Sequence, residues 1–220
     1  NGNPIKVHVK DNKAQLNYTL PQEIGQGQYN ITAVYESNNY NKVENTTQCN
    51  IEGLDIEVKD MEMTIKAKTQ TVLNITLYDE NGVQLIGTIK GVIKLNDKTF
   101  MNTTIKDGVL YEVLDTQTQK VGNHKITVKL GENSLYNAEE FNINLTIIKR
   151  DANISISTNT PTTSGNLIVD VNVTDNEKQI DSGVVSFKIN GKTLLDENNN
   201  TITVNVTEDG KAHLNYIIPS

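Results

Sequence analysis

The sequence contains a single cysteine and no tryptophan, and only 5% of its 220 residues are aromatic. Because Cys49 has no cysteine partner in the chain, a fold that relies on a buried disulfide packed against tryptophan is excluded. Cys49 lies between polar Gln48 and Asn50, and we interpret it as an incidental small side chain rather than a nucleophile or an inter-chain bridge. The hydrophobic core must therefore consist mainly of Ile, Leu and Val, which contribute about 1.5–3 kcal/mol each on full burial.

Long apolar runs and basic clusters are also missing. No run approaches the roughly 20 residues that cross a bilayer, and the first residues do not resemble a signal peptide. We expect any export signal or anchor to lie outside this segment. The net charge of −7 opposes binding to a phosphate backbone. An acidic surface rich in Asn and Thr instead suits a protein that stays dissolved in an extracellular medium, so we expect no membrane insertion here and no nucleic-acid partner.

Catalytic signatures are absent as well. The sequence has no Ser/His/Asp ordering, HExxH, P-loop or Cys-x-x-Cys motif. His8, His124 and His213 fall in separate predicted strands, and we expect each to have a structural role. The sequence predicts a protein that is not an enzyme, needs no cofactor and has no catalytic residues.

Two acidic turns carry oxygen ligands of the kind that calcium prefers, Asp79-Glu-Asn-Gly82 and Asp175-Asn-Glu177. A hairpin turn requires the same residues for backbone reasons, and neither segment has the spacing of a known calcium loop. We therefore predict turns and no metal site, with calcium as the alternative.

What the sequence does contain is an internal repeat. Lys13-Ala-Gln-Leu-Asn-Tyr-Thr-Leu-Pro21 returns as Lys211-Ala-His-Leu-Asn-Tyr-Ile-Ile-Pro219, and Asp107-Gly-Val-Leu-Tyr-Glu-Val-Leu114 is a weaker copy. Gly27-Gln-Tyr-Asn-Ile-Thr-Ala33 and Gly122-Asn-His-Lys-Ile-Thr-Val128 start 95 residues apart. The unit is about 94 residues, the size of one immunoglobulin-like sandwich.

Apolar residues alternate with polar ones along the chain, which predicts strands rather than helices. Leu73, Ile75 and Leu77, for example, alternate with Asn74 and Thr76. Strands that are apolar on one face only belong in an antiparallel sandwich. In the middle of the chain we expect strands over residues 54–66, 71–79, 89–96, 98–105, 109–114, 122–130 and 138–148.

The fold class follows as all-β: tandem immunoglobulin-like antiparallel β-sandwiches with about 94 residues per repeat. Residues 53–148 form a complete repeat, residues 1–52 supply the later strands of an incomplete repeat, and residues 149–220 supply the earlier strands of a further incomplete one. An incomplete sandwich exposes an unpaired sheet edge and half a core, so we expect other strands to complete it. The connector after Ile148 is short and predicts a stiff rod.

Ten Asn-x-Ser/Thr sequons are candidates for N-glycosylation. The 30 Asn residues would give about four or five sequons by chance, and alternation in Asn-rich strands raises that number, so unmodified surface Asn is the alternative. Seven sequons fall on the polar phase of predicted strands, namely Asn17, Asn30, Asn74, Asn144, Asn153, Asn172 and Asn205. Asn45, Asn102 and Asn199 fall in turn-like sequence. A glycosylated chain would be an exported one.

The segment Gly183-Val-Val-Ser-Phe-Lys-Ile-Asn-Gly-Lys192, followed by residues 209–219, resembles the group 3 bacterial immunoglobulin-like repeat. The segment Gly27–Tyr40 resembles the continuation of that repeat. Such repeats are abundant in the large adhesin-like surface proteins of methanogenic archaea. The middle repeat departs from the pattern, with Asn96-Asp97 in place of Asn-Gly. The resemblance implies an immunoglobulin-like fold at the cell surface and offers no catalytic residues.

From these observations we expect a structural and interaction segment of an extracellular adhesin-like protein that forms a stalk or filament. Its partners would be neighbouring immunoglobulin-like repeats or copies of itself. Strand addition between chains is one way to complete the broken repeats, and the alternative is that the segment is a piece of a longer rod. One alternative is a carbohydrate- or protein-binding module that uses Tyr78, Tyr111 or Tyr136 to stack on sugar rings of a cell-surface glycan. The other is an accessory domain of an extracellular enzyme.

Overall fold

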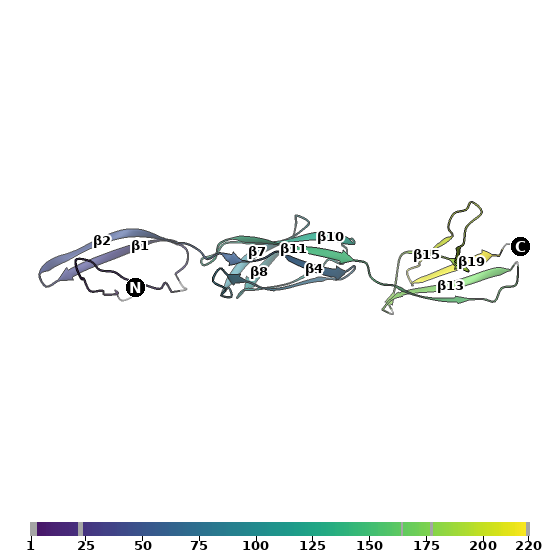
Figure 1. Ribbon diagram of the computed structural model, residues 1–220, viewed down its shortest axis with the longest axis horizontal. Helices are drawn as coiled ribbons and strands as arrows, with labels where there is room; N and C mark the ends of the chain where they lie inside the picture. Colours follow the sequence, from purple (N-terminus) through teal and green to yellow (C-terminus); the bar gives the residue numbers. More distant parts are fainter. Residues whose placement is uncertain (1–3, 22–23, 164, 177, 219–220) are drawn as a thin grey trace. The chain divides into compact units, whose positions relative to one another are not determined.

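Figure 1 shows the computed structural model, which describes residues 4–21, 24–163, 165–176 and 178–218. All the regular secondary structure of these residues is β-strand, which confirms the all-β prediction. The contacts divide the chain into two units, Asn1–Ile147 and Ile148–Ser220, and each is described by itself.

The middle of the first unit contains the strands of the predicted complete repeat. They are β3 (Ile56–Glu57), β4 (Met61–Lys66), β5 (Thr71–Thr76), β6 (Tyr78–Asp79), β7 (Thr88–Leu95), β8 (Lys98–Lys106), β9 (Val109–Leu114), β10 (Gly122–Leu130) and β11 (Glu139–Ile148). The hydrogen-bonded path runs β4-β11-β10-β7-β8-β9-β5. Strands β8 and β9 share only the pair Lys106↔Val109, so the sheet bends sharply between them. The strands on the two sides of this bend form two layers (Figure 1). The pair β3-β6 extends the layer of β5.

Side chains from both layers meet in one apolar core. The core contains few aromatic residues, as the composition predicts, and its largest fully buried side chains are Phe141, Leu73, Leu77, Leu85, Ile89, Ile93, Ile105, Leu110, Leu114, Ile126, Ile143 and Leu145. Burial alternates along β5, where Leu73 is buried and Asn74 is exposed. This period of two is the pattern that the sequence carries.

The first strand differs from the prediction. Residues 54–66 do not form one strand, because β3 pairs with β6 in one layer and β4 lies next to β11 in the other. Between them the chain crosses from layer to layer, and the Asp60 carboxylate accepts a hydrogen bond of 2.9 Å from the amide of Asn142. The alternation of apolar and polar residues in the sequence does not reveal such a crossing, because β3 and β4 have the same period of two.

Two-residue turns close the hairpins at Asn96-Asp97 and Asp107-Gly108. All four residues have positive φ, between 46° and 74°. This geometry matches the twist of the flanking strands and favours Asn, Asp and Gly. At Gly108 a Cβ would also lie 2.9 Å from the carbonyl oxygen of Leu85, so glycine is required there for space as well as for conformation.

The second unit contains fewer and shorter strands. They are β12 (Asn153–Thr158), β13 (Asn166–Asp175), β14 (Lys178–Gln179), β15 (Val184–Ser186), β16 (Lys188–Ile189), β17 (Lys192–Thr193), β18 (Thr203–Asn205) and β19 (Lys211–Ile217). Strand β13 lies between β12 and β19, while β15 pairs with β18 and β16 with β17. A smaller core, which includes Val171, Phe187 and Leu214, lies between them.

The N-terminal residues of the first unit form a hairpin of β1 (Gly27–Ser37) and β2 (Tyr40–Ile51). Within residues 4–21, the only β-pairing is the bridge Lys10↔Lys13. The repeated segment that forms β19 near the C-terminus is therefore irregular in its first copy.

Candidate interaction site

The β1–β2 hairpin has one apolar face that no other segment covers in the described structure. Tyr29, Ile31 and Tyr35 lie on this face of β1, and all three are exposed, Ile31 to 54%. Their partners across the hairpin include Cys49 and Val43. We call this side of the hairpin the open face. A contiguous exposed apolar surface of this kind marks an interaction site.

The opposite side of the same hairpin is mainly polar. Thr32 and Thr46 share a hydrogen bond of 2.8 Å, and Gln28 donates one of 3.1 Å to Gln48. The hairpin is thus amphipathic, as a strand pair is when one side packs on a core.

The complete repeat shows what such a hairpin does when it is covered. Strands β10 and β11 correspond to β1 and β2, and their registers match, with Gly122↔Ile147 corresponding to Gly27↔Ile51. In β10 and β11 the equivalent face lies inside the core, where Ile126 and Leu145 have no exposed surface. The β1 side of the open face therefore carries residues of core type in core positions, whereas β2 has Asn45 and Thr47 where the complete repeat has Phe141 and Ile143.

The second unit has open features of its own. Ile154 and Ile156 on β12 are both exposed by more than 60%, although they alternate with Ser155 as core residues do. Strand β15 pairs on one side with β18. In the complete repeat the corresponding strand β7 pairs with two neighbours, β8 and β10.

Of the three histidines, His124 and His213 form side-chain hydrogen bonds within the fold. His8 lies in the irregular N-terminal segment, exposed to solvent, and not in a strand as predicted. The ring of His124 accepts from the Asn96 amide at Nδ1, over 3.0 Å, and donates from Nε2 to the carbonyl oxygen of Lys120, over 2.7 Å. Both ring nitrogens of His124 are occupied by these contacts.

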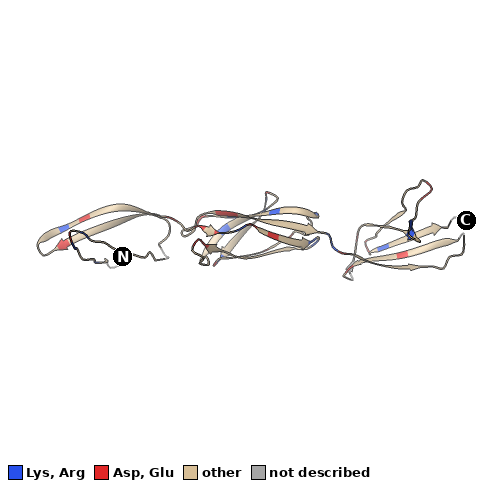
Figure 2. Cartoon of the chain, viewed as in Figure 1, with Lys and Arg blue, Asp and Glu red and all other residues tan. Residues whose placement is uncertain are grey.

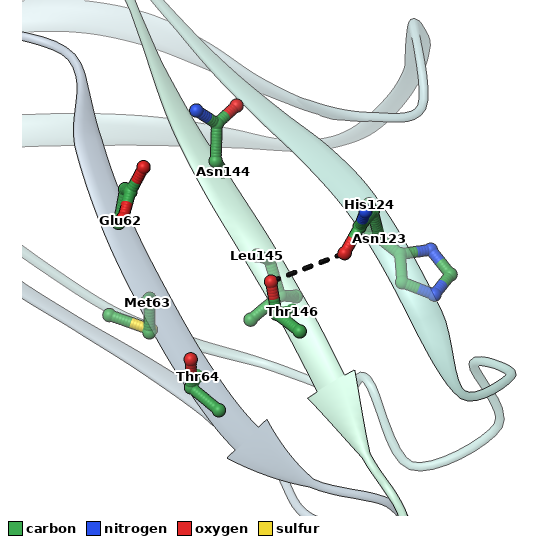
Figure 3. Close-up of a pocket in the computed structure, with 8 residues that line it drawn as sticks. All are labelled: Glu62, Met63, Thr64, Asn123, His124, Asn144, Leu145 and Thr146. Atoms are coloured by element: carbon green, nitrogen blue, oxygen red, sulfur yellow. Dashed lines mark hydrogen bonds between the residues drawn. The ribbon is translucent and has the colours of Figure 1, made fainter.

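A shallow depression of about 310 Å³ lies over β4, β11 and β10 (Figure 3). Glu62 and His124 belong to strands on either side of β11, and Figure 3 shows the imidazole turned away from the carboxylate. Thr146 donates to the Asn123 side chain over 3.3 Å between them. The depression brings together polar groups without an acid–base pair.

Three residues of catalytic type stand in one row of the second unit. Ser157 lies opposite Asp170, and Asp170 lies opposite His213. Nδ1 of His213 is 2.7 Å from the Asp170 carboxylate. A nucleophilic serine requires histidine as its neighbour. Here the aspartate lies between them, so the histidine cannot take the proton of Ser157 through this row.

Asp79 and Asp175 of the two acidic turns use their carboxylate oxygens within the chain, and Glu177 of the second turn lies outside the described residues. Oδ1 of buried Asp79 accepts from the amides of Asn81 and Val83, at 2.9 and 3.0 Å, which is the turn-forming role. Asp175 forms an ion pair with Arg150, and the carboxylate beside it raises the pKa of the guanidinium. The described residues contain no group of three or more His, Cys, Asp or Glu side chains placed to hold a metal ion.

The candidate tyrosines do not form one set. Tyr136 is buried, and its hydroxyl accepts a hydrogen bond of 3.1 Å from the Ile86 amide, so the prediction that it is exposed for sugar binding is wrong. Its hydroxyl satisfies a backbone group inside the fold. Tyr111 is exposed on the outer side of the β5–β9 pair, next to the exposed pair Val72↔Val113. Tyr78 is also exposed, but it belongs to β6 and lies opposite Glu57.

All ten sequon asparagines are exposed. Asn17 lies in irregular structure instead of a strand, whereas Asn45 lies within β2 and Asn102 within β8 instead of in turns. Asn199 is in a turn, with φ of 64°. The others lie in strands, as predicted: Asn30 (β1), Asn74 (β5), Asn144 (β11), Asn153 (β12), Asn172 (β13) and Asn205 (β18). Asn45 lies opposite Ala33 on the open face. The sequence pattern predicts a turn at Asn45 and does not predict this position.

Charges are dispersed along the strands of each part, with acidic and basic residues interspersed (Figure 2). Ion pairs such as Lys129 with Glu140 join neighbouring strands at the surface. Among the described residues, no helix is long and apolar enough to cross a membrane.

The two-layer strand arrangement defines an immunoglobulin-like β-sandwich. No family model matches the sequence, and no curated protein matches it. Among solved structures, the chain is similar to the N-terminal eight Ig domains of Down Syndrome Cell Adhesion Molecule isoform 1.30.30, with 12% identity over 89% of this chain and 28% of that one and a TM-score of 0.31. It is also similar to the N-terminal four Ig domains of Dscam1 isoform 6.9, with 10% identity over 79% of this chain and 50% of that one and a TM-score of 0.30. The chain thus spans half or less of these proteins, and at such TM-scores the description of the fold rests on its own strand pairing.

Proposed function

We propose that this chain is a non-catalytic structural and interaction segment of an extracellular adhesin-like protein, in which immunoglobulin-like repeats form a stalk or filament. The open face of the hairpin carries the proposal, because it presents core-type residues such as Ile31 and Tyr35 to solvent. Repeated modules extend reach by stacking, since each contacts mainly its neighbours. The partners are other immunoglobulin-like repeats or copies of this chain, and the broken repeats are completed by strands of other units.

The ten exposed sequons support the extracellular part of the proposal. N-linked glycans project from strands only where the Asn side chain faces solvent, and attachment takes place during export. A repeat of this kind at the cell surface accounts for the composition without a cofactor or an active site.

Surface labelling of intact cells tests this function. An antibody raised against residues 53–148 is expected to bind intact cells of the source organism, and added protease is expected to remove the signal while a cytosolic marker remains. The intact mass of the native protein should exceed that of the 220-residue sequence in hexose-sized steps. Labelling that requires lysis, together with an unmodified mass, would contradict the proposal.

A carbohydrate- or protein-binding module is the second candidate function. Tyr111 is 61% exposed and lies beside the outward pair Val72↔Val113, so the outer side of β5 and β9 offers an aromatic ring within an apolar strip. Sugar rings stack on such surfaces.

A further inference from the structure

One face of the complete repeat brings together lysines that are far apart in the sequence. They point outward from the neighbouring strands β7 and β10, in phase opposite to the buried core residues of each strand. Because Lys94 lies opposite Thr127, and Val92 lies opposite Lys129, the lysines alternate between the two strands along the sheet. Successive members are diagonal neighbours, about 7–8 Å apart. We call this row the lysine zigzag, and its order along the sheet is Lys125, Lys94, Lys129, Lys90.

The face around the zigzag is basic, although the chain as a whole has a net charge of −7. Strands β7, β10 and β11, which are described in full, carry four outward Lys and one outward Glu. That acid, Glu140, forms an ion pair with Lys129. The hydrogen bond from Lys129, together with the charges of Lys129, Lys125 and Lys94, holds the pKa of Glu140 below its usual 4.5. Since like charges at this spacing repel, the face suits a partner that brings negative charge.

The fold itself does not require lysine at these positions. Strand β1 corresponds to β10, and their registers match. Asn30 of β1 stands where β10 has Lys125, and Val34 stands where β10 has Lys129. A related strand therefore forms the same hairpin with an amide and an apolar side chain at the two places. The lysines of β10 point to a role beyond the formation of the sheet.

The burial of Thr127 indicates that the lysine side chains lie along the sheet. Thr127 faces outward in the same phase as Lys125 and Lys129, yet only 3% of it is exposed. Its hydroxyl donates a hydrogen bond of 3.0 Å to the side chain of Asn142, and Lys94 lies opposite it on β7. A short outward side chain is covered in this way when the longer stems around it extend over it. Packed stems lose less freedom when the ammonium groups bind a ligand.

Amide groups lie beside the zigzag on β11. Asn142 lies opposite Thr127, and Asn144 lies opposite Lys125. Asn144 also lines the depression shown in Figure 3, where Glu62 stands on β4 with β11 between it and the lysines. Amides both donate and accept hydrogen bonds, and so do the hydroxyl groups of sugars. A row of ammonium groups beside a row of amides therefore matches a chain of sugars that carries carboxylates.

The same face is poorly suited to nucleic acid. Along β7, β10 and β11, each described from end to end, no outward side chain is aromatic, so no ring is placed to stack on a base. No outward side chain of these three strands is arginine, the residue that binds phosphate through two parallel hydrogen bonds. Carboxylates on a sugar chain require neither feature, because single ammonium groups pair with them.

We propose that the lysine zigzag of the complete repeat binds a linear acidic polysaccharide, with its ammonium groups on the carboxylates and with Asn142 and Asn144 on the hydroxyl groups. This inference rests on the proposed function, since it names a ligand for an extracellular interaction segment. The zigzag belongs to the layer of β7 and β10, whereas the strip around Tyr111 belongs to the β5–β9 pair, so the two surfaces are tested separately. A glycan on Asn144 would stand beside Lys125, so the unglycosylated chain exposes the whole site.

Charge-removing variants of the unglycosylated full chain test the site, with polygalacturonate as the probe and dextran as the uncharged polysaccharide. Lys94→Gln combined with Lys125→Gln should weaken binding about tenfold and lower the dependence of affinity on salt. Glu140→Gln releases Lys129 from its ion pair and should strengthen binding about threefold. The matched control removes two exposed lysines of the second unit, Lys188→Gln with Lys192→Gln.

The proposal expects binding of polygalacturonate and not of dextran, with affinity unchanged in the control and in Tyr111→Ala. Absence of binding, or equal loss in the lysine control, would overturn it. Tighter binding of single-stranded DNA than of polygalacturonate would overturn the assignment to a polysaccharide. None of these results alters surface labelling of intact cells, so the proposed function is judged independently.

Amide hydrogen exchange of β10 checks that each variant is folded. Glutamine keeps much of the lysine stem, so the cover over Thr127 should be retained. If the combined change at Lys94 and Lys125 disturbs β10, Lys90→Gln replaces it, because Lys90 is exposed at the end of the zigzag. This single change should weaken binding about threefold. Unchanged affinity in a folded Lys90→Gln chain would then overturn the proposal.

Discussion

Asn74 of β5 and Tyr111 of β9 lie directly opposite one another on the outer side of the complete repeat. The neighbouring outward pairs are Val72↔Val113 and Thr76↔Val109, so a sequon stands in the middle of an exposed apolar strip. A glycan on Asn74 would extend over the Tyr111 ring, since directly opposite side chains on one face of a sheet are in contact range. A glycan on Asn74 and a ligand stacked on Tyr111 would therefore compete for the same face.

This relationship predicts how sugar binding responds to modification. If the strip binds free glycans, Tyr111→Ala in unglycosylated protein should lower binding on a glycan array at least tenfold, because stacking is lost. Tyr29→Ala, on the hairpin, is the control and should leave the signal unchanged. Glycosylation of Asn74 should reduce binding as strongly as Tyr111→Ala does. An array signal that survives both changes would exclude this strip as the site.

The repeated segments show which strands can be predicted from the sequence and which cannot. Alternation and turn residues predict the later strands of the complete repeat, from β7 to β11, to within a few residues, because each of these strands has its neighbours within the same repeat. The predicted strands 54–66 and 71–79 are each divided in two in the structure. The two copies of Lys-Ala-x-Leu-Asn-Tyr behave differently: Leu214 in β19 is buried beside β13, whereas Leu16 is 49% exposed in irregular structure. A strand requires a partner, and local sequence does not state whether one is present.

The candidate site was predictable in part for the same reason. The side on which a residue lies depends on register, which the sequence alone does not give. The sequence predicts a turn at Asn45, which lies within β2 on the open face, and an exposed ring at Tyr136, which lies in the core. To predict that the first strand divides into β3 and β4, one must know in which layer the partner of each half lies. Only the strand pairing in the structure gives that information.

A buried hydroxyl pair is expected to contribute to the stability of the complete repeat. The hydroxyls of Thr71 and Thr116 are 2.9 Å apart, and Thr116 donates to the carbonyl oxygen of Thr69 over 2.7 Å. Thr116→Val removes these bonds while keeping the shape, so the free energy of unfolding should fall by about 1–3 kcal/mol. Thr116→Ser keeps the hydroxyl and should lose less. Amide hydrogen exchange of β5 in the full chain measures the loss of stability in both variants. Equal losses in Thr116→Val and Thr116→Ser would show that packing, and not the hydrogen bonds, causes the effect.

The loop that carries Asn199 should respond to acid. The Asp196 carboxylate accepts from the amides of Asn200 and Asn198, at 2.8 and 2.9 Å, and from the Asn200 side chain. The bonds from Asn200 are the main cause that holds the pKa of Asp196 below its usual 3.8. Because the folded pKa is lowered, the stabilisation of the loop is present above the unfolded value and is lost as pH falls through the folded one.

Amide exchange at Asn198 and Asn200 measures this loss. Protection should be constant from neutral pH down to about pH 4 and should then decrease as the carboxylate is protonated. Asp196→Asn retains one acceptor oxygen but cannot ionise, so its protection should be weaker and independent of pH across this interval. Glu197→Gln, in the same loop, is the control and should keep the pH dependence of the unchanged chain. A dependence that persists in Asp196→Asn would assign the transition to another group.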